Sequence, residues 1–472
     1  LIQAGILEKY EKLYSTTSKE DAARRIARFA ETIPDEKWVM GVGFRRMSWE
    51  DTSMPDAGTL DAVIADRPVF LMDEELHMAW LNSRGLQECG IDKNTEAPDG
   101  GIICRDENGE PTGVLLENAV ALAAKHAFEF DKKTVKQLIE GYIDKAVSLG
   151  ITSVSDMTPY LSLDLSFPEV YFEMVSNNEL KIRVNAARNL FEDINTFNEI
   201  RQKADLEGKG FYRVPYMKQF IDGTPANFTG MLLEDYSDNP GEKGKATIDL
   251  DKMAAAIETA TENNISVRLH SCGDRSCREA INAYENALKK FPETESRHMV
   301  EHLELVDPND IPRFGQLGII CSIQPEHLAA GTMKWEENCY PEKLGPERER
   351  YTWPFKQLKD NGAVLAGGTD CPVVEGNLFW GMYAGNTRKY YDDIPEGGWN
   401  PQEKLTMPEM IDMFTSGAAY AEHRENELGT LEEGKLADIT VVDRNLLELE
   451  ENPNIRDTKV LLTMVDGRVV YS

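Results

Sequence analysis

The chain has 472 residues, and its 41% hydrophobic and 28% charged content is that of an ordinary globular protein. Acidic residues outnumber basic ones by 82 to 51, and the resulting formal charge of −31 disfavours nucleic acid and anionic membranes as partners. No apolar stretch approaches the roughly 20 residues that span a bilayer, and residues 1–10 lack the apolar core of a signal peptide. We therefore expect a cytoplasmic protein that binds neither nucleic acid nor membranes. Its length is enough for one large α/β barrel with a small appended unit.

The N-terminal part of the chain begins with a predicted helix and a predicted strand. Residues 18–32 are typical of a helix, because Thr17 or Ser18 can cap its first turn. Residues 38–44 then have the pattern of a strand interrupted by glycines. No helix with a third glycine follows, which argues against a dinucleotide-binding loop. The irregular pattern after this strand indicates an insertion, at about 41–117, that lies over one face of the main domain.

The middle of the chain alternates between helical and strand patterns. Such alternation predicts a parallel sheet, and the number of repeats favours a closed TIM (β/α)8 barrel over an open sheet. The predicted helices lie at 134–149, 191–206, 250–263, 276–289, 307–317 and 353–361, and the predicted strands at 151–156, 182–185, 216–220, 266–270, 298–302, 319–323 and 363–366.

The C-terminal part has a different texture. A helix is predicted at 406–417, with Thr406 and Glu409 at the spacing of a capping box. Strands at 460–465 and 468–471 flank an Asp-Gly pair, which is a strong hairpin signal. We therefore predict two domains: a barrel over 1–427, which contains the insertion, and a small β domain over 428–472 that is the C-terminal part of a β-sandwich.

Four polar residues stand where predicted strands end: Lys218, His270, His302 and Asp370. In a parallel barrel, the C-terminal ends of the strands converge on one face, where catalytic residues lie. Imidazoles and carboxylates can hold zinc or a similar divalent ion and leave one position open for water. A lone buried histidine is more often an ordinary core residue, but three such residues at three strand ends favour a metal site. Lys218 does not fit this pattern directly, because an ammonium group cannot bind a cation.

The seven cysteines are odd in number, and no pair has the two-residue spacing of a zinc ribbon or redox motif. Cys272 and Cys277 follow His270 closely, where a thiol could in principle touch a metal. The pattern nevertheless favours reduced cysteines that pack in the interior.

Several strings, spread in order over nearly the whole chain, carry a family resemblance. They lie at 60–62, 66–70, 77–83, 111–115, 218–223, 270–275, 301–302, 368–370 and 434–438. With these strings the chain resembles the amidohydrolase superfamily of metal hydrolases on (β/α)8 barrels, and within it the N-substituted formamide deformylase-like branch. The resemblance implies that Lys218, His270, His302 and Asp370 bind one or two ions of zinc or another divalent metal. It also implies that Lys218 is carboxylated to a bridging carbamate, with an ordinary salt-bridged lysine as the alternative.

The resemblance extends to residues around the metal. It implies that His77 points into the pocket as a catalytic or substrate-binding residue, although a packing role is nearly as well supported. His327 and Arg275 are further candidates for substrate binding, and a structural ion pair is an equal alternative for Arg275. The family also has a His-x-His at the end of its first strand, but none of the seven histidines here are spaced by two. We expect that the sequence begins just after this motif.

The function implied is hydrolysis of a carbon–nitrogen, amide-type bond of a small molecule, outside peptides, by metal-activated water. Asp370 would accept a proton from the water and pass it to the leaving nitrogen. A lactone or ester hydrolase is an alternative, because the same site attacks any activated carbonyl. A non-catalytic, barrel-fold binding or regulatory protein is an alternative of another class. Beyond the small-molecule substrate, the expected partner is a second copy of the chain, in a homodimer or higher homo-oligomer.

Overall fold

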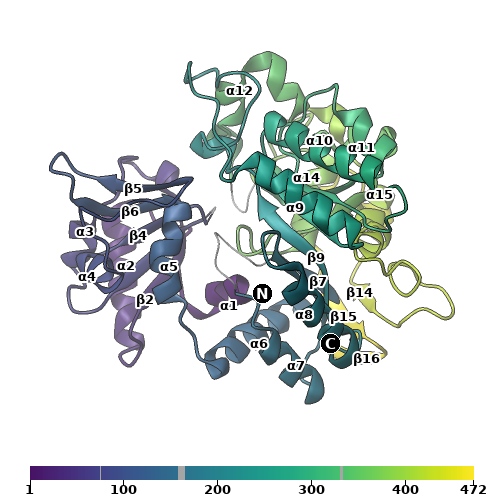
Figure 1. Cartoon of the computed structure of the whole chain (residues 1–472), viewed down its shortest axis with the longest axis horizontal. Coiled ribbons are helices and arrows are strands. Elements are labelled where there is room, and N and C mark those ends of the chain that lie inside the picture. The colour runs from purple at the N-terminus through teal and green to yellow at the C-terminus, as the bar shows by residue number, and fades with distance from the viewer. Residues whose placement is uncertain (75, 158–164, 330–332) are drawn as a thin grey trace. The chain divides into compact units, whose positions relative to one another are not determined.

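The structure is a computed structural model, and it describes residues 1–74, 76–157, 165–329 and 333–472. The chain divides into two compact units (Figure 1). The first contains Leu1–Tyr142 and Cys371–Val373, and the second contains most of the chain from Ile143 to Ser472. The predicted domain boundaries, at about 41–117 and at 428, remain a prediction.

The first unit is built on a six-stranded mixed sheet with the order β1-β2-β3-β4-β6-β5. Strands β1, β2 and β3 are parallel, and the remaining pairs are antiparallel. Ser18 caps helix α2 by accepting a hydrogen bond from the Asp21 N–H, as predicted. The elements are α1 (Ile2–Lys9), β1 (Glu11–Lys12), α2 (Lys19–Thr32), β2 (Val39–Phe44), α3 (Ala57–Asp61), β3 (Val69–Asp73), β4 (Met78–Leu81), α4 (Ser83–Glu88), β5 (Gly101–Arg105), β6 (Pro111–Glu117) and α5 (Ala121–Ala127).

The region that is irregular in sequence therefore contains four strands of this sheet, β3 to β6. Every residue of β3 and β4 is buried. Strands buried on both faces are apolar throughout and do not alternate, which removes the period-two signal by which a strand is predicted.

The second unit is built on a curled parallel sheet of seven strands, ordered from β13 through β12, β11, β10, β9 and β8 to β7. All of its neighbouring strands pair in parallel, which confirms the predicted α/β alternation. Figure 1 shows α9, α10 and α11 side by side over one face of this sheet. The strands are β7 (Ser153–Asp156), β8 (Arg183–Asn189), β9 (Tyr212–Phe220), β10 (Ser266–Ser271), β11 (Met299–His302), β12 (Ile320–Ile323) and β13 (Leu365–Gly367). A closed eight-stranded barrel remains a prediction.

The helices of the second unit follow the strands. They are α7 (Pro168–Ser176), α8 (Ile194–Glu207), α9 (Leu250–Glu262), α10 (Asp274–Lys290), α11 (Ile311–Leu317), α12 (Tyr340–Arg348), α13 (Phe355–Asp360), α14 (Leu378–Thr387), α15 (Met407–Asp412) and α16 (Ala418–Ala421), and α6 (Lys132–Ser148) leads into the unit. Thr406 and Glu409 form the predicted capping box of α15, and a π-helical turn at 413–417 continues it.

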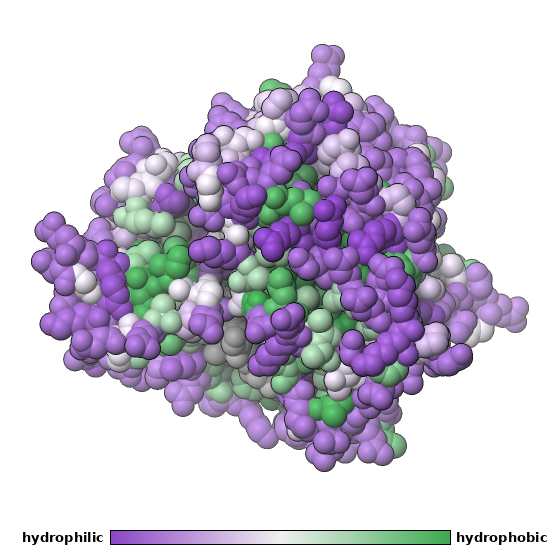
Figure 2. All heavy atoms as spheres, turned by 45° about the horizontal axis from the view of Figure 1, so that its top comes forward, coloured by the Kyte–Doolittle hydropathy of each residue, from purple (hydrophilic) through white to green (hydrophobic). Residues whose placement is uncertain are grey.

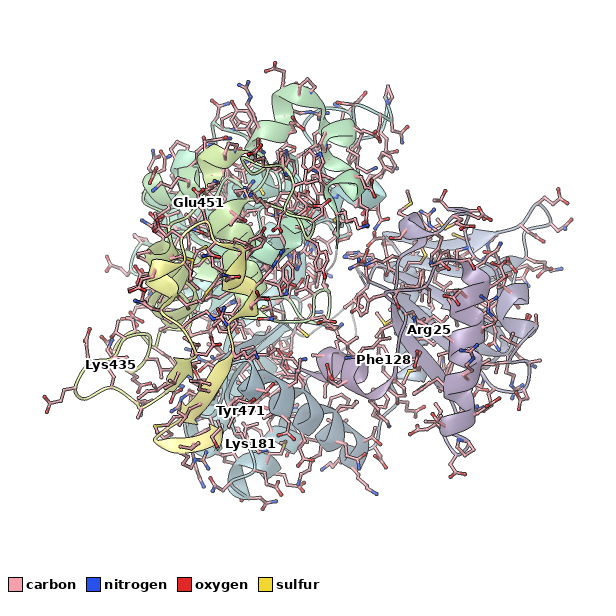
Figure 3. All side chains as sticks on the ribbon, turned by 180° about the vertical axis from the view of Figure 1, so that it is seen from behind. Arg25, Phe128, Lys181, Lys435, Glu451 and Tyr471 are labelled. Carbon is pink, nitrogen blue, oxygen red and sulfur yellow. The ribbon has the colours of Figure 1, made fainter. Side chains whose placement is uncertain are left out.

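The C-terminal segment forms a small antiparallel sheet in the order β14-β15-β16. Strands β15 (Val460–Val465) and β16 (Arg468–Tyr471) are the predicted hairpin, and both turn residues have the positive φ that such a turn requires. The Thr463 hydroxyl donates to the Val147 carbonyl at 2.7 Å, and Thr440, on β14 (Ile439–Val442), donates to Gly150. Figure 3 shows Tyr471 on the last strand and Lys435 on the loop that precedes this sheet.

Hydrophilic residues cover most of the visible face of the protein (Figure 2), in keeping with the large excess of acidic side chains. Among the described residues, none of the helices combines the length and the apolar character needed to cross a membrane.

Candidate metal centre

The candidate site lies at the carboxyl ends of β9, β10 and β11. In the strand register, Phe220 pairs with His270, and His270 pairs with Glu301. Lys218 lies two residues before Phe220, so these side chains share one face of the sheet. The pleat alone would turn His302, one residue after Glu301, to the other face.

A left-handed backbone brings His302 back to the site. His302 has φ 76° and Leu303 has φ 56°, which are conformations that residues other than glycine rarely adopt. The His302 ring consequently lies 4.4 Å from the His270 ring, centroid to centroid. Asp370 also has a positive φ, of 59°. Backbone strain of this kind collects at functional sites, because the surrounding structure must stabilise it.

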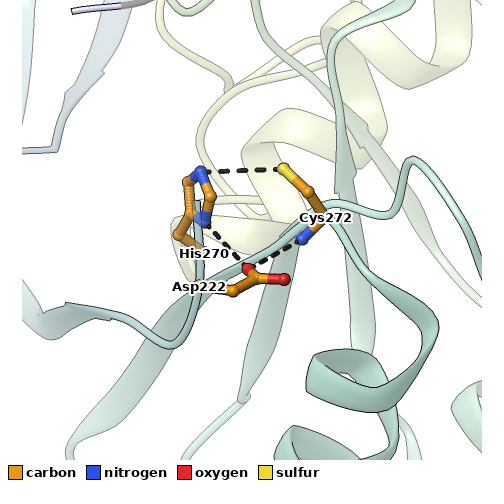
Figure 4. A group of neighbouring side chains, drawn as sticks. All are labelled: Asp222, His270 and Cys272. Carbon is orange, nitrogen blue, oxygen red and sulfur yellow. Dashed lines mark hydrogen bonds and ion pairs between the residues drawn. The ribbon is translucent and has the colours of Figure 1, made fainter. Parts of the chain in front are cut away.

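His270 is held by the carboxylate of Asp222, which lies two residues after the end of β9. Asp222 Oδ1 lies 3.4 Å from His270 Nδ1 and accepts a hydrogen bond of 3.1 Å from the Cys272 N–H (Figure 4). Asp222 Oδ2 accepts bonds from the N–H groups of Met231 and Gly273 and from the Ser276 hydroxyl, at 2.7–2.9 Å. Asp222 therefore anchors the loop after β10 and fixes the orientation of the imidazole, as carboxylates behind metal-binding histidines do.

The loop after β10 depends on a glycine. A Cβ at Gly273 would lie 2.1 Å from the Met231 carbonyl oxygen, so no larger residue fits without movement of the backbone. The other ring nitrogen of His270, Nε2, faces Cys272 Sγ at 3.7 Å (Figure 4). Asp222, His270 and Cys272 thus offer three potential ligand atoms within 4.8 Å of one another.

A second group of potential ligands adjoins the first and consists of His302, His327 and Asp370. The rings of His302 and His327 are stacked with centroids 5.7 Å apart, and His327 Nε2 lies 3.8 Å from Asp370 Oδ2. Burial lowers the pKa of His327 to about 4. The imidazole is therefore neutral near pH 7, which is the form that binds metals.

Lys218 is buried beside these groups. Its Nζ atom lies 4.6 Å from the centre of the Phe220 ring, and that ring in turn contacts His270. Burial lowers the pKa of the Lys218 ammonium to about 8, although the carboxylates of Glu301 and Asp370 act in the opposite direction. Most of this lysine is therefore charged at pH 7, and a minor fraction is a neutral amine.

A deeper layer of charged residues lies below the histidines. Arg268, two residues before His270, contacts the Glu422 carboxylate through Nη2 and lies 3.5 Å from Glu301 through Nη1. Its guanidinium also lies over the ring of Tyr216, 4.0 Å from the centroid. The guanidinium in this layer is thus paired with two carboxylates.

Two other candidates are not members of the two ligand groups. His77 belongs to the first unit, where its Nδ1 is 2.7 Å from Glu117 Oε2. Arg275 points into solvent with 47% of its side chain exposed, and it lies 3.8 Å from Glu279. Asp274, not Arg275, holds the neighbouring loop, by accepting a hydrogen bond from the Leu233 N–H.

The sequence interpretation gave no role to Asp222 and set Cys272 aside as a packing residue. Asp222 could have been recognised as an acidic residue shortly after a buried strand that also carries Lys218. Three of its four donors, however, lie 50–54 residues further along the chain, and this part of the arrangement has no local signal.

The donor chemistry of the site fits a divalent metal. Imidazoles, carboxylates and a thiol, which lie close together within two adjoining groups, are the ligand types that zinc and similar ions prefer. The buried Nε2 atom of His327 makes no hydrogen bond to any described residue, as expected for a nitrogen that is reserved for a ligand.

This fold and these candidate ligands fit a metal-dependent hydrolase. The chain matches the amidohydrolase family over residues 10–471 and belongs to it. It is 28% identical to the protein LONG AFTER FAR-RED 3 of Arabidopsis thaliana, over all of this chain and 80% of that protein. It is 25% identical to the N-substituted formamide deformylase of Arthrobacter pascens, over 94% of this chain and 81% of the enzyme.

A solved structure has the same fold. An uncharacterized metal-dependent hydrolase from Pyrococcus horikoshii OT3 superposes with a TM-score of 0.72 at 22% identity, over 95% of this chain and 85% of that one. The family resemblance read from the sequence is thus confirmed.

Proposed function

We propose that this protein is a metal-dependent hydrolase that cleaves a carbon–nitrogen, amide-type bond in a small molecule. The observation that carries the proposal is the convergence of His270, His302 and Asp370 at or after the ends of strands of one parallel sheet, with Lys218 buried beside them. The likeness to a formamide deformylase supports the bond type.

Lys218, His270, His302 and Asp370 would hold one or two divalent ions, with zinc as the expected metal. A bound ion of this kind polarises a carbonyl group and makes water a nucleophile near neutral pH. The neutral amine form of Lys218 supports carboxylation, because carbon dioxide reacts with an uncharged amine. Asp222 keeps the His270 ring oriented throughout.

Asp370 is suited to move the proton. Its side chain is 35% exposed, whereas that of the adjacent His327 is only 10% exposed, so Asp370 can be reached by both water and substrate. It would accept a proton from the attacking water and return it to the leaving nitrogen, with His327 beside it to fix its position. We further propose that His77, His327 and Arg275 contact the substrate. The proposal also includes a closed barrel, a cytoplasmic location and a homo-oligomer.

The proposal is tested with protein that has been stripped of metal by a chelator. Zinc, manganese or cobalt is then added back, and hydrolysis of N-acyl amino acids, N-substituted formamides, lactones and simple esters is measured. We expect metal-dependent cleavage of the amide-type compounds. Cleavage of lactones or esters alone would favour the alternative substrate class. Full metal binding without hydrolysis of any class would favour a binding protein.

A further inference from the structure

The loop after β10 places a thiol next to a candidate metal ligand. Cys272 is 1% exposed, and its sulfur lies 3.7 Å from His270 Nε2. In Figure 4, the thiol faces one nitrogen of the imidazole while Asp222 faces the other. Nε2, the ring nitrogen that does not face Asp222, is therefore the candidate metal-binding atom, and it lies beside the sulfur.

The separation of the two atoms suits a shared metal ion. Zinc binds thiolate sulfur at about 2.3 Å and imidazole nitrogen at about 2.0–2.1 Å, so two such ligands at a tetrahedral angle lie about 3.6 Å apart. The distance of 3.7 Å between Nε2 and Sγ is close to this value. An ion could therefore bind both atoms with little movement of either side chain.

One carboxylate positions both donors. Asp222 Oδ1 contacts the His270 ring through Nδ1 and also accepts from the backbone N–H of Cys272. The ring of Phe220 packs against the imidazole from another side, with centroids 4.8 Å apart. A ligand pair that is already held in place binds an ion more tightly than one that must first be ordered.

We propose that Cys272 is a ligand of the metal centre and that it chelates the ion together with His270. This inference rests on the metal centre of the proposed function and adds a sulfur donor to it. A sulfur ligand favours zinc, cobalt and cadmium over magnesium and manganese, which prefer oxygen ligands. It also requires loss of the thiol proton when the ion binds, so metal uptake releases a proton.

Cys277, near the start of α10, provides a matched control for Cys272. It is also buried, but its sulfur lies near the Ser271 hydroxyl, at 3.3 Å, and near the Leu305 carbonyl, at 3.6 Å. None of the seven cysteines, all of which belong to the described part of the chain, forms a disulfide. Replacement of either cysteine by serine is therefore a comparable change at a comparable depth.

The experiment is titration of the metal-stripped protein with Co²⁺, followed by ultraviolet and visible absorption. Thiolate ligands give Co²⁺ an intense sulfur-to-metal charge-transfer band, whereas nitrogen and oxygen ligands do not. We expect this band in the wild type and in Cys277→Ser, and its loss in Cys272→Ser. We also expect Cys272→Ser to bind Co²⁺ at least about tenfold more weakly, since loss of a ligand should cost no less than loss of a residue that only supports one.

A wild-type protein that binds Co²⁺ without the band would overturn the role of Cys272 and leave the proposed hydrolase intact. The role of Cys272 would also be overturned if the Cys272→Ser protein kept the band. Loss of the band in Cys277→Ser but not in Cys272→Ser would have the same consequence. Absence of any Co²⁺ binding by the folded wild type would contradict both the ligand and the proposed function. X-ray absorption of the cobalt-loaded wild type tests the sulfur ligand without any substitution, should Cys272→Ser fail to fold.

Discussion

The strands β9, β10 and β11 carry polar side chains at two depths, and the two layers differ in how their charges are balanced. In the deeper layer, Arg268 is paired with Glu301 and Glu422. In the outer layer, His270 and His302 lie against each other and near a thiol and a carboxylate, all of which are electron-pair donors.

The difference indicates a structural role for the deeper layer and supports the proposal that the outer layer binds an ion. A buried cation that is paired with carboxylates is neutralised by the protein itself. A set of imidazole, thiol and carboxylate donors that lie close together can instead share a metal ion. Each of the following substitutions alters a residue of one layer or one that supports it.

The largest expected effect follows from Asp370→Asn in the outer layer. The variant should fold normally and lose about 10²–10⁴-fold in kcat, the usual contribution of a general acid–base group. Steady-state kinetics on any substrate found in the screen will check this. Turnover close to that of the wild type would remove Asp370 from the mechanism.

In the deeper layer, Glu422→Gln should reduce stability. Removal of one partner from a buried pair typically costs about 3–5 kcal/mol in the free energy of unfolding. We expect no more than this here, because Arg268 keeps Glu301 as a partner. Urea denaturation measures this loss, while the metal content per folded chain should not change. A large drop in metal content with unchanged stability would reverse the roles of the two layers.

Lys218→Ala should lose most activity and at least one metal ion per chain. If the lysine is carboxylated, short-chain carboxylic acids should restore part of the activity by filling the vacated position. Elemental analysis and kinetics with added acetate are the measurements. A crystal structure with two metals beside a plain lysine would rule out the carbamate.

Asp222→Asn should have a smaller effect, because we expect Asp222 to support His270 and not to be the principal ligand. Loss of such a support typically weakens metal affinity by about 10–100-fold. Isothermal titration with zinc will measure it, with Arg275→Ala as the control, since the exposed Arg275 side chain should leave metal affinity unchanged. Equal affinities for wild type and Asp222→Asn would mean that the imidazole needs no such support.

Local patterns made much of the fold predictable. The βα rhythm from β7 to β13, the capping box at Thr406 and the Asp466–Gly467 hairpin follow from residues that are close in sequence. Helix α14 was missed because eight of its ten residues are buried, and a helix that is apolar around its whole circumference has no amphipathic period.

The candidate site was predictable only in part. The four strand-end residues are visible in the sequence because each follows an apolar run. The orientation of His302 depends on a left-handed φ that the sequence does not reveal, since glycine is the usual residue there. The contact between Asp222 and His270 and the approach of Cys272 to Nε2 depend on how the loops after β9 and β10 fold against each other.

The central claim is that the strand ends hold a catalytic divalent ion. The most direct test is metal titration of the double variant His270→Ala/His302→Ala in parallel with the wild type. Both proteins would be stripped with a chelator, checked for folding by circular dichroism and titrated with zinc in a calorimeter. We expect tight binding of one or two ions to the wild type and no tight binding to the folded double variant. Identical zinc stoichiometry and affinity in the two proteins would contradict the assignment of the metal centre.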